Sequence, residues 1–200
     1  MAWSTGGHAR IGGAVRRVSG AELLRHADGV ARVYADAFGT GPWSQDRAAA
    51  ARYAERLAAD VARPGFVAAL ALDGDAVRGF ATGRRTPGVF PSGGCHPQVS
   101  AGLGAERTKL WLCGAREVDE LAVHGPARGR GLGAALLDAV SADAPDGRCW
   151  LLTSVRAEAA MSFYRRLGWA QATHPAPGGA GYAAFLGPRH PARTAVPLPL

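Results

Sequence analysis

Residues 117–140 of this chain, EVDELAVHGPARGRGLGAALLDAV, decide how it folds. Residues 117–123 predict a strand, and residues 132–143 predict a helix with one apolar face. The turn between them is rich in glycine. Glycine lets a backbone approach a ligand closely, and the free N–H groups at a helix N-terminus attract anions. The stretch therefore predicts a binding site for a phosphate group, such as the pyrophosphate of a nucleotide cofactor.

Two common phosphate-binding turns do not fit this sequence. The GxxxxGK[ST] loop does not occur in the chain. Gly129, Gly131 and Ala134 satisfy the GxGxxG/A pattern of dinucleotide-binding domains. That pattern belongs in the first strand–helix unit of a doubly wound sheet, with an acidic residue about 20 positions later. The next predicted strand, residues 149–155, ends without a carboxylate, so a dehydrogenase is not expected.

The rest of the chain alternates between predicted strands and helices, which predicts a mixed α/β (α+β) domain. Ser19 and Glu22 form a capping box that opens a helix, and Gly39 supplies a left-handed stop. Asp73-Gly74 is a favoured turn dipeptide between two antiparallel strands. The other predicted elements are strands at residues 14–18, 66–72, 76–84, 149–155 and 182–186, a helix from a cap at Ser44 to about residue 62, and a helix that carries Ala160, Phe163, Tyr164 and Leu167.

The length suits a single domain. We expect a flexible leader at residues 1–13, the domain at residues 14–187 and a proline-rich tail at residues 188–200. Residues 86–108 are rich in Gly, Pro and Ser and contain no long periodic stretch. Because this segment is too long for an ordinary connector, it predicts a binding loop or a mobile lid.

The composition bounds the partners of the protein. The net charge is +7, and nearly all of the excess is arginine, with Lys109 as the only lysine. No basic run alternates with aromatic residues as in single-strand nucleic-acid binders, so we expect no nucleic-acid partner. Cys95, Cys113 and Cys149 are too widely spaced to suggest a disulfide framework or a zinc site. No stretch approaches the roughly 18 apolar residues of a membrane span, so we expect a cytoplasmic protein without a membrane partner or a metal.

Several motifs in residues 117–169 occur together. They are the ELAV run at residues 120–123, Pro126, an Arg-x-x-Gly-x-Gly turn at residues 128–133, two leucines at residues 136–137 and the FYRRLGW run at residues 163–169. In order and spacing they resemble the GNAT superfamily of N-acetyltransferases, while residues 14–84 agree with that fold without a specific motif. The resemblance implies a GNAT-like, mainly antiparallel mixed sheet with splayed central parallel strands and helices on both faces.

The resemblance also implies acetyl-coenzyme A (acetyl-CoA) as co-substrate. In this family the pantetheine arm lies between the splayed strands, where backbone groups of Leu121, Ala122 and Val123 would pair with it. A free N–H near Val123 would polarise the thioester carbonyl. The candidates for holding the pyrophosphate are Arg128, Gly129, Arg130, Gly131, Leu132, Gly133 and Ala134.

The sequence departs from the family pattern at one cofactor contact. The family often has an asparagine seven positions before the helix tyrosine, where this chain has Ala157. The asparagine contact is therefore absent or replaced. Arg156 and Glu158 are the neighbouring residues that would replace it.

Transfer to an amine needs a base for the acceptor's proton and an acid for the departing thiolate, unless water serves. Glu117 stands six positions before Val123, where some family members keep a base, and we prefer it to Glu120. Glu120 is nearer the thioester but faces the opposite side of a regular strand, which a bulge would reverse. Asp119 is a third option. Tyr164 matches the position of the family's acid, although plain core packing would also explain it.

The acceptor side carries little sequence signal. Trp43 and Phe90 are candidate walls of the acceptor pocket, because the family builds that pocket from the first interhelical break and the long loop. An antibiotic amine, a polyamine, an amino acid and a protein N-terminus are all compatible acceptors. His96 and His124 receive no role. The alternative function is a catalytically silent regulatory module that binds acetyl-CoA, and a homodimer is left open as the oligomeric state.

Overall fold

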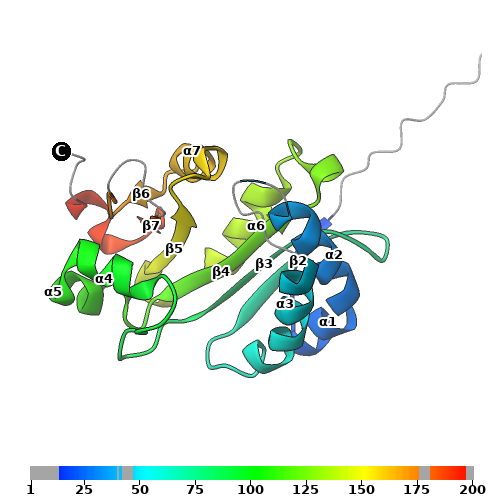
Figure 1. Cartoon of the computed structure of the whole chain (residues 1–200), viewed down its shortest axis with the longest axis horizontal. Helices are drawn as coiled ribbons and strands as arrows, with labels where there is room; N and C mark the ends of the chain where they lie inside the picture. Colours follow the sequence, from blue (N-terminus) through cyan, green and yellow to red (C-terminus); the bar gives the residue numbers. More distant parts are fainter. Residues whose placement is uncertain (1–13, 40, 42–46, 176–180, 197–200) are drawn as a thin grey trace, which may run out of the picture.

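A computed structural model describes residues 14–39, 41, 47–175 and 181–196. Within them one seven-stranded sheet has the order β1-β2-β3-β4-β5-β7-β6. Neighbouring strands are antiparallel except β4 and β5, which are parallel. The predicted mixed, mainly antiparallel sheet is confirmed (Figure 1). The strands are β1 (Ala14–Val18), β2 (Val67–Asp73), β3 (Ala76–Arg85), β4 (Arg116–Val123), β5 (Cys149–Ser154), β6 (Ala170–Gln171) and β7 (Tyr182–Leu186).

Helices cover both faces of the sheet. On one face the first three helices bury Leu23 and Leu57 against Phe80 of β3. On the other face α6 and α7 bury Leu136 and Tyr164. The helices are α1 (Gly20–Arg25), α2 (Ala27–Phe38), α3 (Arg47–Asp60), α4 (His96–Leu103), α5 (Ala105–Arg107), α6 (Leu132–Ser141) and α7 (Glu158–Arg166), with short 3-10 turns at Gly125–Ala127, Pro145–Gly147 and Pro191–Ala195 and a π-helical turn at Thr108–Leu112.

The N-terminal helix differs in detail from the prediction. The Ser19 hydroxyl accepts a hydrogen bond from the Glu22 N–H at 3.2 Å, as a cap should. The Glu22 carboxylate pairs with an arginine of β1. The helix is interrupted at His26, which separates α1 from α2. Gly39 ends α2 with φ −71°, so the predicted left-handed stop is wrong. The predicted cap Ser44 lies outside the described residues.

Residues 86–108 are not one open loop. Residues 96–107 form α4 and α5. Helix α4 buries Val99 and Leu103, four residues apart on one face, in a cluster with Trp150 of β5. This short apolar pair is hidden in the sequence among glycines, prolines and serines. The predicted loop is therefore wrong in form for this part of the segment, which packs as helix against β5 and β7. Its predicted role in binding stays a prediction.

Strands β4 and β5 pair over a short distance only. Their register begins with Arg116 opposite Cys149 and ends with Val118 opposite Leu151. Beyond Val118 the strands diverge, and Figure 1 shows β5 turning away from β4. The splayed central strands that the resemblance implied are present. Within the described chain, one side of β4 from residue 119 to residue 123 therefore has no strand partner.

Candidate active site

The open edge of β4 presents backbone groups to the gap between the splayed strands. The His124 N–H donates to the Arg78 carbonyl of β3 at 2.9 Å. Successive residues of a strand point their N–H and C=O groups to opposite sides, so Leu121 and Val123 direct theirs away from β3. Arg128 Nε donates to the Val123 carbonyl at 3.0 Å. The Val123 N–H and both backbone groups of Leu121 thus face the gap, where an extended ligand would pair with them.

A pocket of about 830 Å³ lies along this edge. Its volume is within the roughly 300–1,000 Å³ of small-molecule sites. The end of β4, the glycine turn, the start of α7 and the C-terminal end of α2 line it. Among the predicted cofactor residues Arg130, which is exposed, is not part of the lining. The predicted residues that do line the pocket are Leu121, Ala122, Val123, Arg128, Gly129, Gly131, Leu132, Gly133 and Ala134.

The glycine turn lines the end of the pocket where the sequence predicts an anion to bind. Gly129 and Gly131 have φ of 76° and 79°, which residues with side chains rarely adopt. A Cβ at Gly131 would meet no heavy atom within 4 Å, so this residue is open towards the pocket. Gly131 is also the N-cap of α6, whose first N–H groups have no partner within the helix. A Cβ at Gly133 would come within 3.3 Å of Phe163, so this glycine allows α7 to pack closely.

Ala157, which stands where the family often has an asparagine, is the N-cap of α7 and lines the pocket. Its side chain offers no hydrogen bond to a ligand. Arg156 and Glu158, the two neighbours suggested as replacements, line the pocket beside it. Arg166 also lines the pocket. Nothing in the sequence marked Arg166 as a lining residue, because it lies in a motif whose matching residues are mainly packing residues.

A β-bulge in β4 sets the direction of its acidic side chains. Two consecutive residues of β3 pair with Glu120 and with Val118, so Asp119 is an extra residue in the register. Val118 packs in the core under α6, whereas Ala122 packs in the core under α2 and α3. Side chains alternate on either side of the bulge. Glu117 and Glu120 therefore share the face covered by α2 and α3, and do not lie on opposite faces as in a regular strand.

Glu120 directly precedes the strand end that lines the pocket. Burial raises the pKa of its carboxyl group to about 8, and the Asp119 charge adds to that effect. Arg56 opposes the rise in pKa, but its Nη2 lies 3.9 Å from Glu120 Oε1, too far for a hydrogen bond. A base works best when its pKa is near the working pH. Glu120 has this property.

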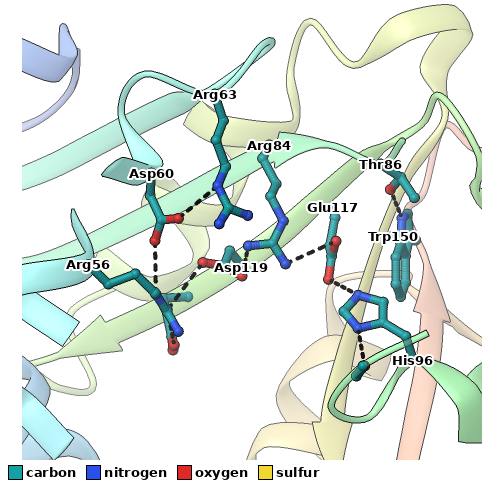
Figure 2. Close-up of polar contacts among 11 residues, drawn as sticks. Arg56, Asp60, Arg63, Arg84, Thr86, His96, Glu117, Asp119 and Trp150 are labelled. Atoms are coloured by element: carbon teal, nitrogen blue, oxygen red, sulfur yellow. Dashed lines mark hydrogen bonds and ion pairs between the residues drawn. The ribbon is translucent and has the colours of Figure 1, made fainter. Parts of the chain in front are cut away.

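His96, which is partly buried, contacts the carboxyl group of Glu117 (Figure 2). Glu117 Oε1 lies 3.0 Å from His96 Nε2, and His96 Nδ1 lies 3.2 Å from the Gly93 carbonyl oxygen. A carbonyl oxygen only accepts, so Nδ1 carries one proton, and the contact with the carboxylate requires a second. The hydrogen bond with Glu117 raises the pKa of His96. One oxygen of Glu117, which is 3% exposed, is therefore engaged by His96.

Tyr164 approaches the gap from α7. It is 9% exposed, and its ring packs near Trp169 and Phe185. It also lines the pocket. Burial first, and the Glu120 charge second, raise the pKa of the phenol, so it stays protonated at neutral pH. Tyr164 thus combines a packed ring with a hydroxyl group that is a proton donor beside the pocket.

The two predicted acceptor residues fare differently. Trp43 lies outside the described residues. The Phe90 ring lies 5.4 Å from the His96 ring and 5.8 Å from the Trp150 ring, which places it beside the partner of Glu117. His96, which received no role from the sequence, thus contacts a predicted catalytic residue and a predicted acceptor residue. Arg56 of α3 was missed, because no motif marks a helix arginine as the neighbour of a distant strand.

The described residues hold no other obvious site type. Cys95, Cys113 and Cys149 are free thiols. In this part of the chain no group of three or more His, Cys, Asp or Glu side chains is arranged to hold a metal ion. None of the described helices is both long and apolar enough to cross a membrane.

Several solved structures have a similar fold. A GNAT-family protein from Desulfovibrio desulfuricans is 21% identical, with a TM-score of 0.56 over 86% of this chain and 95% of that chain. A protein from Corynebacterium glutamicum described as histone acetyltransferase HPA2 and related acetyltransferase is 20% identical, with a TM-score of 0.56 over 88% and 96%. The PaiA N-acetyltransferase of Thermoplasma acidophilum, in complex with coenzyme A, is 12% identical, with a TM-score of 0.57 over 87% and 97%. At these identities the likeness shows the fold.

The family follows from the sequence match. Comparison with curated proteins gives no match. The acetyltransferase (GNAT) domain family matches residues 65–171. This span is more than half of the chain and contains the glycine turn, both splayed strands and α7. The protein therefore belongs to the GNAT family of acetyltransferases.

Proposed function

We propose that the protein moves the acetyl group of acetyl-CoA to a primary amine by direct transfer in a ternary complex. The observation that carries the proposal is the single pocket that joins the open edge of β4, the glycine turn and Tyr164. A cofactor with an amide-bearing arm and a polyanionic end requires this combination of groups. The structure of the Thermoplasma relative with coenzyme A supports the same ligand class.

The lining residues fit acetyl-CoA part by part. Gly131 and the N-terminus of α6 offer N–H groups to a pyrophosphate. Leu121 offers backbone groups to an extended arm with amides, as a strand edge does for a peptide. The Val123 N–H is directed to where it would donate to a carbonyl oxygen that gains negative charge. Acetyl-CoA, when bound, supplies an acetyl group activated as a thioester.

Two side chains then handle the protons. Glu120 accepts a proton from the acceptor nitrogen as this nitrogen bonds to the thioester carbon. The Tyr164 hydroxyl donates a proton to the sulfur as the carbon–sulfur bond breaks. The Glu120 pKa of about 8 and the effect of its charge on Tyr164 support these roles, because they put a base and an acid near one another. Glu117, which the sequence alone preferred, is instead occupied by His96.

Acetyl-CoA is expected to raise the melting temperature of the protein, because a ligand that binds only the native state stabilises it. At a free concentration 100 times Kd the gain is about 2.7 kcal/mol. A thermal melt with and without acetyl-CoA measures this, with NAD and ATP as controls. If NAD or ATP stabilises the protein and acetyl-CoA does not, the proposal is wrong. Release of coenzyme A with a panel of amines separates an enzyme from a silent acetyl-CoA-binding module.

Tyr164→Phe is expected to lower kcat about tenfold and to leave the affinity for acetyl-CoA nearly unchanged. The effect is below the usual range for acid–base catalysis, because a thiol with a pKa of about 8.5 leaves readily as thiolate. The measurement needs saturating acceptor and a fast substrate, since slow product release hides a slower chemical step. Tyr164→Ala is the packing control and should destabilise the fold by about 3–5 kcal/mol. A native kcat for Tyr164→Phe would leave Tyr164 with a packing role only.

A further inference from the structure

We propose that the acceptor is an amine with a carboxylate next to its amino group, and that Arg56 binds this carboxylate beside Glu120. The inference rests on the proposed function and names the acceptor class for the same site. It is carried by a charged cluster on the face of the sheet that α3 covers, most of which Figure 2 shows. The cluster consists of Arg56, Asp60, Arg63, Arg84, His96, Glu117, Asp119 and Glu120.

Arg56 is held in place by contacts with Asp60 and Tyr53. Its Nε donates to Asp60 Oδ2 at 2.9 Å, and Arg63 Nε lies 3.1 Å from the other Asp60 oxygen. Asp60 is buried, so this anchor is fixed in the fold. The Arg56 guanidinium also lies 5.4 Å from the centre of the Tyr53 ring. A side chain that is ordered before binding loses less conformational entropy when a ligand arrives.

The outer nitrogens of Arg56 remain available. Nη2 lies 3.7 Å from Asp119 and 3.9 Å from Glu120, and both distances exceed a hydrogen bond. Asp119 is already paired with Arg84 at 2.7 Å. Among the described residues no hydrogen-bond partner is found for Nη1 or Nη2 of Arg56, and the side chain is 50% exposed. A guanidinium held at Nε presents a fork that matches a carboxylate.

Arg56 and Glu120 are spaced to hold two groups of one small molecule. Glu120 Oε1 accepts from an amine, and Arg56 Nη2, 3.9 Å away, donates to an oxygen. An amine and a carboxylate on the same carbon lie side by side and can bridge these two groups. Burial holds Glu120 largely protonated below about pH 8, so it does not repel an incoming carboxylate at neutral pH.

The charge of the cluster disfavours a polycation. Arg56, Arg63 and Arg84 are positive, and His96 holds a proton because both of its ring nitrogens face acceptors. Against these four positive groups stand Asp60, Glu117 and Asp119, with Glu120 neutral below its raised pKa. A polyamine would thus meet a site that is neutral to positive. A zwitterion or anion with an amino group meets complementary charge.

Matched pairs of acceptors test this inference. The full-length protein is assayed for release of coenzyme A with glycine, alanine, phenylalanine and glutamate, with their decarboxylated amines, and with spermidine. We expect kcat/KM to be about tenfold higher for the amino acid than for its decarboxylated partner. The factor is modest because Arg56 is half exposed and solvent screens its charge.

Arg56→Gln should remove the preference by lowering kcat/KM more for the amino acids than for the decarboxylated amines. Both members of a pair share any loss that comes from a higher Glu120 pKa, because Arg56 opposes the rise of that pKa. Arg56→Lys keeps the positive charge but lacks the two outer nitrogens of the guanidinium group. It should therefore retain part of the preference for amino acids. Arg78→Gln is the control, because Arg78 pairs with Asp73 at 2.9 Å and is not part of the charged cluster. It should leave the preference intact. If a thermal melt shows that Arg56→Gln does not fold, the inference is tested by comparing the acceptor preference of the native protein with that of Arg56→Lys.

The inference is overturned if native protein prefers decarboxylated amines or spermidine, or if Arg56→Gln lowers both members of each pair equally. It also falls if acetyl-CoA stabilises the protein but no carboxylate-bearing amine is acetylated. These outcomes leave the proposed binding of acetyl-CoA intact. Failure of acetyl-CoA to stabilise the protein, in contrast, removes the proposed function itself.

Discussion

Glu120→Gln is expected to lower the rate of acetyl transfer by about 10²–10⁴-fold, the usual contribution of a general base. Glutamine keeps the size of the side chain but cannot take the acceptor's proton. Because burial raises the pKa of Glu120 to about 8, the native rate should rise with pH through that value as the carboxylate forms. The measurement is kcat at a series of pH values with one acceptor. The titration of the acceptor's amine is then the same for the native protein and for the variant.

Glu117→Gln is the matched control for this prediction. It lies on the same strand and the same face, but one oxygen of its carboxylate contacts His96 at 3.0 Å and the other lies 3.4 Å from Arg84. Its loss should therefore lower turnover less than the loss of Glu120 does. If Glu117→Gln lowers turnover more than Glu120→Gln does, the base is Glu117, as the sequence alone preferred. Near-native rates in both variants would point to a proton relayed by water.

Glu120 should also make the stability of the fold fall as the pH rises from about 5 to 8. The folded protein keeps a proton on Glu120 between its ordinary pKa of 4.5 and about 8, whereas the unfolded chain releases it. Stability falls with rising pH wherever the folded state binds more protons, so this contribution is lost as pH rises across that window. In Glu120→Gln the side chain at this position does not ionise. Its melting temperature should therefore fall less than that of the native protein between about pH 5 and pH 8.

Gly131→Val is expected to weaken the binding of acetyl-CoA and so to reduce the stabilisation that acetyl-CoA gives. Gly131 has φ of 79° and lines the pocket with open space where a Cβ would stand. A valine there either occupies the phosphate position or moves the N–H groups of the turn. The loss of one hydrogen bond to a charged group costs about 1.5–3 kcal/mol, which lowers affinity roughly 10–150-fold. Isothermal titration of acetyl-CoA measures this affinity directly.

Gly74→Val is the control for backbone strain. Gly74 also has positive φ, 57°, and a Cβ there would meet nothing within 4 Å. It lies in the β2–β3 turn and not in the pocket lining. Both variants should lose fold stability from the strained valine, but only Gly131→Val should lose acetyl-CoA. Equal loss of affinity in the two variants would show that the glycine turn has no specific part in binding.

The cofactor half of the site was predictable because its parts are neighbours in the chain. The glycine turn, the N-terminus of α6 and the end of β4 are contiguous. Positive φ at Gly131 and free N–H groups in the first helical turn follow from local chemistry. Hence most of the predicted cofactor residues line the pocket. Arg130 does not line the pocket, because the direction of a side chain on a turn depends on the tertiary contacts around it.

The acceptor half of the site comes from segments far apart in the chain. Arg56 comes from α3, Arg84 from β3 and His96 from α4, and all three meet the acidic residues of β4. No motif connects these positions, so composition alone made the segment of His96 look like a loop. Only packing of α4 against β5 and β7 brings the imidazole to Glu117.

The sequence by itself determined the family, the order of the main strands and helices, and the glycine turn, because each depends on residues near one another in the chain. The tertiary structure alone decided that Glu120, the proposed base, lies on the same face as Glu117. That placement depends on one extra residue, Asp119, in the pairing of β4 with β3. Because side chains alternate along a strand, a one-residue bulge moves Glu120 to the other face. Whether a strand contains such a bulge is set by its partner strand and by the helices that cover it.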